Sequence, residues 1–189
     1  TEEVLRENAA YEARINEAEE ALSRRGFPRT AIFRQPVVWG EHDQYQHVNN
    51  AHYIRWFESA RMRWMERMSR TLSPEIASNL VRGRGVGIIL ASTYCRYRRP
   101  VTYPDTVVIG QAALPMKFAD RVTVRSQAYS VAQSAIVAEA DFECVAYDYD
   151  RLCKASLPPE VADALRAWTY TGEDKEPYCQ KTSRRKTVS

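Results

Sequence analysis

The stretch "NNAHYIRWFESARMRWMERM", residues 49–68, decides the fold because it is far richer in apolar side chains than a surface helix needs. The side chains that form its broad apolar face at helical spacing are Tyr53, Ile54, Trp56, Phe57, Ala60, Trp64, Met65 and Met68. Arginines and glutamates, Arg61 among them, occupy the other side at the spacing of helix ion pairs. Asn49 or Asn50 is a suitable N-cap. The pattern predicts a long helix enclosed by other elements.

Four segments after this helix predict strands, at residues 86–100, 105–114, 121–131 and 135–150. They are rich in Val, Ile, Thr and Tyr and are separated by turn residues. A further strand is expected at residues 35–41, "QPVVWGE", and short helices at residues 73–81 and 158–168. Short connections favour antiparallel neighbours. The sequence therefore predicts an α+β hot-dog fold, a five-stranded antiparallel sheet wrapped round the long helix.

Three regions follow from the pattern along the chain. Residues 1–28 form an N-terminal helical extension, whose thin apolar stripe favours packing on a surface or on a partner subunit, with a solvated appendage as a close alternative. Residues 29–168 form the hot-dog domain. Residues 169–189 are polar and basic without a period, which predicts a tail that is flexible or ordered by a partner.

The composition excludes several broad classes. The chain has 27 basic and 24 acidic residues, and a net charge of +3 directs it neither to a membrane nor to nucleic acid. Its four cysteines show no metal-type spacing, and no secretory or membrane-length apolar run is present. We expect an intracellular protein, and both cytosol and mitochondrial matrix stay open because a removed transit peptide would leave no trace.

All three histidines lie within residues 39–53, "WGEHDQYQHVNNAHY", which raises the question of a metal site. His42, His47 and His52 are five residues apart, whereas helical ligand pairs need a spacing of three or four. We therefore expect no metal and no cofactor. The chain has no Gly-x-Ser-x-Gly element, and the glycines of residues 83–87 lead into an apolar strand rather than a helix, so neither a serine nucleophile nor a phosphate loop is predicted.

A carboxylate just before the helix remains as the candidate for chemistry. Backbone amides in the first turn of a helix lack partners and lie at the positive end of its dipole. A thioester carbonyl lodged there would find its developing oxyanion stabilised, while Asp43 attacked the carbonyl carbon or deprotonated water. Spacing alone favours a plainer role for Asp43, as a turn or cap carboxylate.

The stretch "WGEHDQYQHVNNAHYIRWFESAR" resembles the signature of the hot-dog thioesterases of the 4-hydroxybenzoyl-CoA thioesterase group, and "YCRYRRPVTYPDTVVIG" extends the resemblance more weakly. The resemblance covers about residues 30–168 and implies an acyl-CoA thioesterase. It implies that Asp43 is the nucleophile or general base, that His47 and Asn50 position substrate or water, and that the Asn50 or Ala51 amide contacts the oxyanion. Gln46 departs from the group, which usually has glycine there.

The element "QHVNN" is also similar to one in plant acyl-ACP thioesterases. Tyr45 stands where that family has a mechanistic asparagine, so an asparagine-dependent mechanism is not expected, although an acyl-ACP substrate stays open. We expect three residues to contact the substrate near its acyl group, namely Tyr45, Gln46 and Tyr53. We expect four arginines to contact the phosphates of CoA, namely Arg96, Arg98, Arg99 and Arg121. Solvated charge is an equally good explanation of the arginines.

Two further expectations concern assembly. A lone hot-dog sheet leaves a long edge and a half-lined pocket, so we expect a homodimer or homotetramer with the active site at the subunit interface. The alternative to an enzyme is a non-catalytic hot-dog subunit that binds acyl groups or acts as a scaffold in a larger, possibly mitochondrial, assembly. The N-terminal helix and basic tail motivate it, because the chemistry needs neither.

Overall fold

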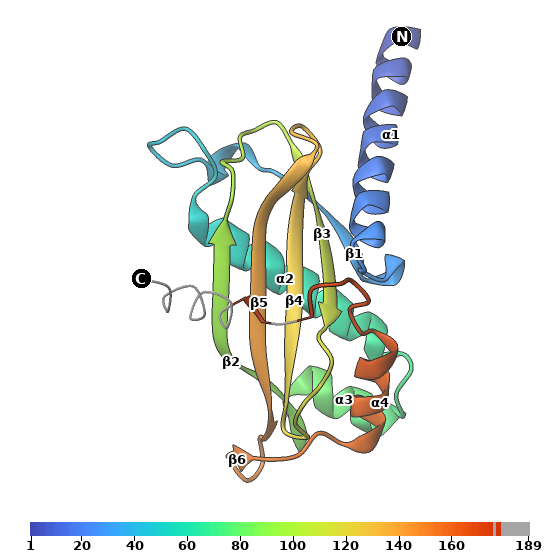
Figure 1. Cartoon of the computed structure of the whole chain (residues 1–189), viewed down its shortest axis with the longest axis vertical. Coiled ribbons are helices and arrows are strands. Elements are labelled where there is room, and N and C mark those ends of the chain that lie inside the picture. The colour runs from blue at the N-terminus through green and yellow to red at the C-terminus, as the bar shows by residue number, and fades with distance from the viewer. Residues whose placement is uncertain (176, 179–189) are drawn as a thin grey trace.

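The computed structural model describes residues 1–175, 177 and 178. Its core is an antiparallel sheet with the strand order β1-β3-β4-β5-β2. The strands are β1 (Ile32–Pro36), β2 (Val86–Tyr97), β3 (Thr106–Ala113), β4 (Arg121–Ser130) and β5 (Ala135–Asp148), and a two-residue strand β6 (Cys153–Lys154) pairs with the end of β5. The sheet curls round a long helix (Figure 1), which confirms the predicted hot-dog fold.

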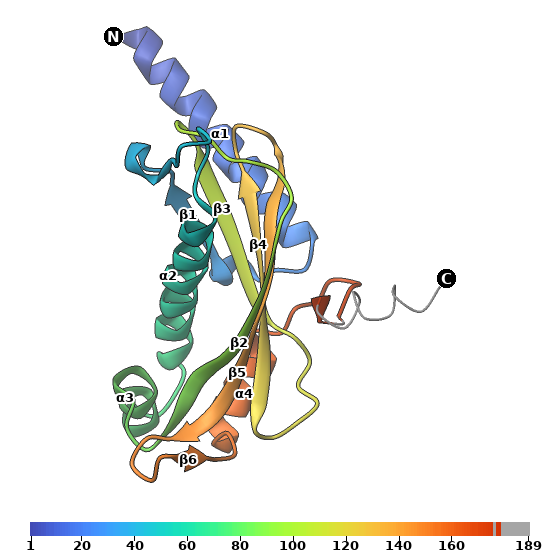
Figure 2. The ribbon, with the colours of Figure 1, turned by 90° about the vertical axis from the view of Figure 1, so that its left-hand side faces the viewer.

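Helix α2 (Asn50–Ser69) lies against the inner face of this sheet (Figure 2). Phe57 is fully buried and meets the ring of Phe142 edge-on, with 5.8 Å between the ring centroids. Burying a side chain of this kind contributes about 1.5–3 kcal/mol, so α2 and the sheet stabilise each other. Gln111 of β3 adds a buried hydrogen bond of 2.7 Å to the carbonyl oxygen of Phe57.

Arg61 does not follow the predicted division of α2 into apolar and polar sides. We expected it on the polar side, but only 6% of it is exposed. Its guanidinium lies 4.7 Å from the centroid of the Phe142 ring, and Glu58, the nearest carboxylate, is 4.0 Å away. The long apolar stem and the attraction of the cation to the ring explain the burial.

Two short helices close one end of the sheet, α3 (Pro74–Arg82) and α4 (Pro159–Ala167). Ser73 precedes α3 as predicted, but its hydroxyl does not cap the helix. Both its amide and its hydroxyl donate instead to the carboxylate of Glu160, which ties α3 to α4. Helix α3 ends at Gly83, whose φ of 62° is the left-handed conformation that glycine adopts without strain.

The first strand is not where the sequence predicted it. We expected residues 35–41 to be extended, but β1 ends at Pro36 and residues 39–41 form a 3-10 turn, η2 (Trp39–Glu41). The Glu41 carboxylate closes this turn by accepting a hydrogen bond of 2.8 Å from the amide of Val38. A side-chain contact therefore turns the chain toward α2, and the apolar pattern alone does not show it.

Helix α1 (Glu2–Arg24) combines both behaviours expected of it. Its second half packs on the outer face of the sheet through Ile15, Ala18 and Leu22, next to Val108 of β3. Its first half runs on beyond the end of the sheet (Figure 1), where Leu5 is 69% exposed. The helix thus covers one side of the outer face and projects from the rest of the molecule.

The segment after α4, which includes residues 169–175, 177 and 178 of the predicted tail, lies against the outer face of the sheet. The amide of Tyr170 donates to the carbonyl of Ala113 at 2.7 Å, and the amide of Tyr178 donates to the carboxylate of Asp141 at 2.6 Å. Residue 176 and residues 179–189, the rest of the predicted tail, lie outside the described residues.

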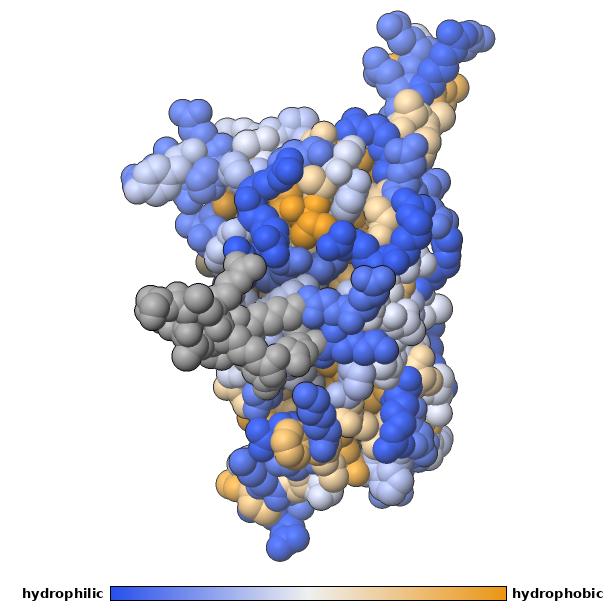
Figure 3. Space-filling view, viewed as in Figure 1, coloured by the Kyte–Doolittle hydropathy of each residue, from blue (hydrophilic) through white to orange (hydrophobic). Residues whose placement is uncertain are grey.

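The outer face carries many polar side chains with apolar patches between them (Figure 3). Strand β5 places three carboxylates there at alternate positions, Glu139, Asp141 and Glu143. Arginines from neighbouring strands pair with each of them in turn, namely Arg98, Arg125 and Arg121. Within the described part of the chain, no helix is long and apolar enough to cross a membrane.

Candidate active site

Asp43 lies in a tight turn just before α2. Its backbone carbonyl accepts a hydrogen bond from the amide of Gln46 at 3.0 Å, and its amide donates to the carbonyl of His47 at 3.1 Å. One carboxylate oxygen accepts from the amide of Tyr45 at 2.8 Å, and the other lies 3.4 Å from the side-chain nitrogen of Asn49. The half-buried carboxylate is therefore fixed between the turn and the start of the helix.

Asn49, and not Asn50, is the N-cap of α2. Its side-chain oxygen accepts a hydrogen bond of 2.9 Å from the amide of Ala51, and its carbonyl accepts one of 2.9 Å from the amide of His52. The expected oxyanion contact from the Ala51 amide is thus already occupied by the cap. The Asn50 amide has no hydrogen-bond partner among the described residues, and it lies at the positive end of the helix dipole.

Tyr45 and His47 lie beside Asp43 on the same turn. Their rings stack with 6.2 Å between the centroids, and Tyr45 is 71% exposed. A ring nitrogen of His47 is 3.3 Å from the carbonyl oxygen of Val48. The turn therefore brings together the three predicted residues Asp43, Tyr45 and His47, and it leaves an aromatic surface open to a ligand.

Gln46 has a backbone φ of 62°, in the left-handed region that glycine tolerates best. This conformation lets the turn close between Asp43 and His47. The left-handed conformation also accounts for the glycine that is usual at this position in the 4-hydroxybenzoyl-CoA thioesterase group. The chain keeps the same turn with a glutamine, at a conformational cost of about 1–3 kcal/mol.

The other two histidines have structural contacts. A ring nitrogen of His42 accepts a hydrogen bond of 2.8 Å from the amide of Tyr103, which ties the turn to the connection between β2 and β3. A ring nitrogen of His52 lies 3.6 Å from the carboxylate of Glu41. No group of three or more potential metal ligands occurs among the described residues.

Glu41 is a residue of this region that sequence reasoning missed. Besides closing η2, its carboxylate accepts a hydrogen bond of 2.9 Å from the indole of Trp56, one and a half turns into α2. Its backbone carbonyl accepts a hydrogen bond of 3.0 Å from the amide of Asn49. Glu41 thereby fixes the turn on the helix. One indication of this role was available in the sequence, since Glu41 is an acidic residue within the quoted stretch of residues 39–53.

Tyr53 and Tyr97 stand behind the helix start. Tyr53 is 2% exposed, so it belongs to the core rather than to an open substrate surface. The ring of Tyr97 meets it edge-on at 5.3 Å, and the Tyr97 hydroxyl donates to the carbonyl of Asn50 at 3.2 Å. Burial raises the pKa of each phenol to about 12. Tyr97 was also missed by sequence reasoning.

The predicted phosphate-binding arginines do not lie with Asp43 in this chain. Tyr97 faces α2, and neighbouring residues of a strand point to opposite faces, so Arg96 and Arg98 point to the outer face. Arg98 pairs there with Glu139. Arg99 lines the same outer surface groove as Arg96 and Arg98.

Arg121 lies on the outer face as well. It is held between Asp120 and Glu143, with contacts of 3.1 and 3.0 Å. All four arginines therefore lie on the outer face of the sheet, opposite to the face that carries α2. Alternation along a single strand could not show which of the two faces carries the helix.

A protein-family model, the thioesterase-like superfamily, matches residues 37–165 and so spans the turn, α2 and strands β2 to β6. The chain belongs to the thioesterase-like superfamily. This membership supports thioester hydrolysis as the general activity. A proposed esterase from Aquifex aeolicus is 24% identical over 135 residues, which are 71% of this chain and 97% of that protein.

Solved structures share the fold of this superfamily member. A protein from Pseudomonas aeruginosa strain PAO1 is 22% identical with a TM-score of 0.63, covering 75% of this chain and 93% of its own. A 1,4-dihydroxy-2-naphthoyl-CoA thioesterase from Synechocystis is 16% identical with a TM-score of 0.60, covering 71% and 94%. A gentisyl-coenzyme A thioesterase is 15% identical with a TM-score of 0.58, covering 71% and 98%. At these identities the likeness concerns the fold alone.

Proposed function

We propose that this protein hydrolyses acyl-CoA thioesters to a free acid and CoA. One observation carries the proposal: a carboxylate, Asp43, is fixed beside an unpaired helix-terminal amide, that of Asn50. A base or nucleophile next to an oxyanion donor is the minimum that acyl transfer needs. Membership of a thioesterase-like superfamily fits the same chemistry.

In the proposed reaction, the thioester carbonyl oxygen faces the Asn50 amide, and Asp43 faces the carbonyl carbon. Either Asp43 attacks that carbon, expels CoA as its thiolate and forms an anhydride that water opens, or Asp43 removes a proton from the attacking water. In both routes the amide and the helix dipole stabilise the negative charge that develops on the oxygen. His47 and the stacked ring of Tyr45 are then positioned to hold the substrate beside Asp43.

The acyl group is proposed to be apolar or aromatic. Tyr45 offers an exposed ring beside Asp43, and aromatic faces stack well on aromatic acyl groups. Two of the structural relatives are named as thioesterases of aromatic acyl-CoA substrates, which is consistent with this class. The rival substrate class is acyl-ACP, which carries the same thioester on the same pantetheine arm.

A homodimer is proposed as the working form, through the β2 edge. Strand β2 is the last strand of the sheet and has no further strand beside it among the described residues. Leu90 of β2 is 42% exposed, and Met62 on α2 is 49% exposed. Unpaired strand edges with apolar side chains are ready to pair with a second copy.

The dimer is tested by the mass in solution. We expect twice the chain mass for the wild type, and a monomer for Leu90→Glu because a buried charge would oppose the pairing. Val81→Glu is the matched control, since Val81 is an exposed apolar residue on α3. A monomeric wild type at micromolar concentration, or a Leu90→Glu variant that still dimerises as the control does, would remove this part of the proposal.

The competing function is a non-catalytic subunit of a larger assembly. The feature that favours it is α1, whose first half projects from the sheet with Leu5 exposed. Purification from native extract separates the two functions. A stoichiometric complex with other proteins would support the scaffold, whereas a free homo-oligomer would support the enzyme.

The enzymatic proposal is tested by release of free thiol from a panel of short, long and aromatic acyl-CoA thioesters, with matched acyl-ACP substrates in parallel. We expect turnover of at least one CoA substrate class above the rate of its spontaneous hydrolysis. Turnover of acyl-ACP alone would move the substrate to the carrier protein. The absence of turnover across the whole panel would sink the proposed activity.

A further inference from the structure

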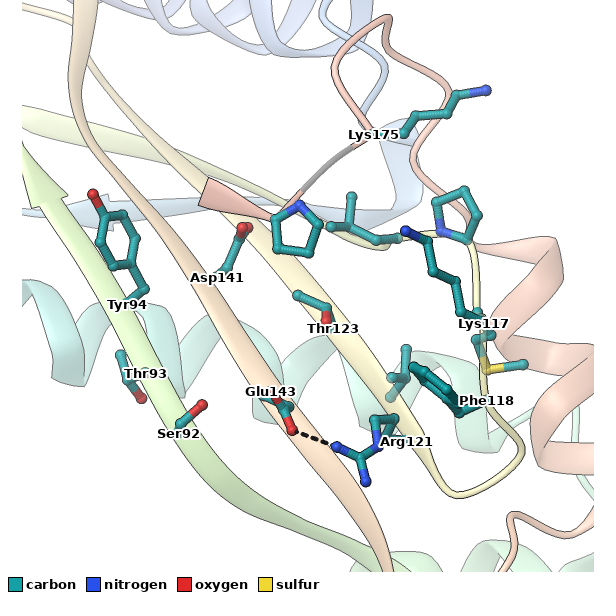
Figure 4. Close-up of a pocket in the computed structure, with 15 residues that line it drawn as sticks. Ser92, Thr93, Tyr94, Lys117, Phe118, Arg121, Thr123, Asp141, Glu143 and Lys175 are labelled. Atoms are coloured by element: carbon teal, nitrogen blue, oxygen red, sulfur yellow. Dashed lines mark hydrogen bonds and ion pairs between the residues drawn. The ribbon is translucent and has the colours of Figure 1, made fainter. Parts of the chain in front are cut away.

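A cavity lies on the outer face of the sheet, and Asp43 is not among the residues that line it. It has a volume of about 360 Å³ and is bounded by β2, by the connection between β3 and β4, and by residues 175 and 177 (Figure 4). Helix α2 and the turn of Asp43 lie on the inner side of the same sheet (Figure 2). Small-molecule sites measure roughly 300–1,000 Å³, so this cavity suits a small ligand.

One wall of the cavity is apolar. The connection between β3 and β4 contributes Met116 and Phe118, and Pro177 lies on the C-terminal segment. Phe118 is 62% exposed, although a large aromatic side chain gains from being covered. This wall offers a surface for the apolar part of a ligand.

The carboxylates at the cavity each have an arginine partner. Asp141 receives two hydrogen bonds of 3.0 Å from the buried guanidinium of Arg125. Glu143 pairs with Arg121 at 3.0 Å, which is the contact drawn in Figure 4, and Asp120 pairs with the same arginine. Because Arg121 is shared between Glu143 and Asp120, these three carboxylates and two guanidiniums together leave one negative charge.

Two lysines at the rim are not neutralised in this way. Lys117 and Lys175 line the cavity, and neither has a carboxylate partner among the residues that the structure describes. Both are exposed and have long flexible stems, so their ammonium groups can turn toward a ligand. The unbalanced charge of the cavity is therefore positive.

Hydroxyl groups complete the lining. Ser92 comes from the edge strand β2 and Thr123 from β4, and both are in register with Glu143 on the outer face (Figure 4). In the described part of the chain neither of these two hydroxyls has a hydrogen-bond partner, whereas the carboxylates around them are paired. They can donate to an anionic group as well as the lysines can.

We propose that this cavity binds a small amphipathic carboxylate. The apolar body of the ligand lies against Phe118 and Met116, and its carboxylate lies among Lys117, Lys175 and the hydroxyls of Ser92 and Thr123. The assignment rests on three features of one cavity: an apolar wall, carboxylates that already have arginine partners, and two lysines that have no carboxylate partner among the described residues. It does not depend on hydrolysis at Asp43.

The test is direct binding of octanoate to the full-length protein, measured by calorimetry. Octanol supplies the apolar body without the charge, inorganic phosphate supplies charge without the body, and octyl phosphate supplies a different anion. We expect saturable binding of octanoate and at least about tenfold weaker binding of octanol and phosphate. Octyl phosphate binding tenfold more tightly than octanoate would overturn the carboxylate assignment.

Variants place the binding in this cavity. The double variant Lys117→Ala/Lys175→Ala should bind octanoate about tenfold more weakly, and Phe118→Ala should weaken it as well. Lys154→Ala is the matched control, because Lys154 is also exposed but does not line the cavity. Asp43→Asn should bind octanoate as the wild type does. No saturable binding, or equal binding by the double variant and the control, would overturn the proposal.

Discussion

Asp43 illustrates how far single residues could be predicted. The motif placed Asp43, Tyr45 and His47 together, and the structure brings them onto one turn because each has a local contact there. The hydrogen bond from the Ala51 amide to the side chain of Asn49 was not predictable, because Asn49 and Asn50 are equally suitable N-cap residues by type. The contact of Glu41 with Trp56 was also missed, because side-chain partners 15 residues apart leave no period in the sequence.

Gln46→Gly is expected to stabilise the protein by about 0.5–1 kcal/mol, because it removes a side chain from a left-handed backbone position. Chemical denaturation measures the change in the free energy of unfolding. Gln44→Gly in the same turn is the matched control, since Gln44 is not among the residues with positive φ, and there the added chain freedom should give no gain. Equal effects of the two glycines would contradict the role given to the Gln46 backbone.

The helices and strands with a long periodic pattern of their own were predicted best. Helix α2 and strands β2 to β5 follow from long periodic segments, and the structure has them close to the predicted positions. Strand β1 was placed too late, because Pro36 and the Glu41 contact end it where the apolar pattern continues. Arg61 was placed on the wrong side of α2, because an aromatic ring of β5 attracts it into the core.

Asn49→Ala is expected to lower the free energy of unfolding by about 1 kcal/mol, because the Ala51 amide loses its cap. The neighbouring variant Asn50→Ala should change it by less than about 0.5 kcal/mol, since no hydrogen bond of that side chain is seen among the described residues. Thermal or chemical denaturation of the two variants measures the difference. A larger loss for Asn50→Ala would mean that the helix starts one residue later.

At the scale of the whole molecule, the inner face of the sheet was predictable from the sequence and the outer face was not. The inner face follows from the apolar periods of the strands and α2. The outer face depends on the buried pair of Arg125 and Asp141 and on the C-terminal segment that covers it, with Tyr178 over the guanidinium at 3.9 Å. A polar segment with no period looks flexible in sequence, because the strand residues that hold it are more than 30 positions away.

Alkaline pH is expected to destabilise the fold. Burial raises the pKa of Tyr53, Tyr97 and Tyr178 to about 12 in the folded protein, against about 10 in an unfolded chain. The folded state thus holds these protons more tightly, so their stabilising contribution is complete below pH 10 and is lost as the pH rises toward 12. Urea unfolding from pH 8 to 12 measures it. The slope above pH 10 should be shallower for Tyr97→Phe, and identical slopes would contradict this source of stability.

The account as a whole depends on Asp43, and kcat/KM of Asp43→Asn on the best substrate of the acyl-CoA panel tests it most directly. Asparagine keeps the hydrogen bond from the Tyr45 amide, so the turn should fold, while the base or nucleophile is gone. We predict a fall in kcat/KM of at least about 100-fold. Asp163→Asn, a change of the same kind at an exposed residue of α4, should retain wild-type kcat/KM. Equal kcat/KM values for Asp43→Asn and Asp163→Asn would contradict the central claim.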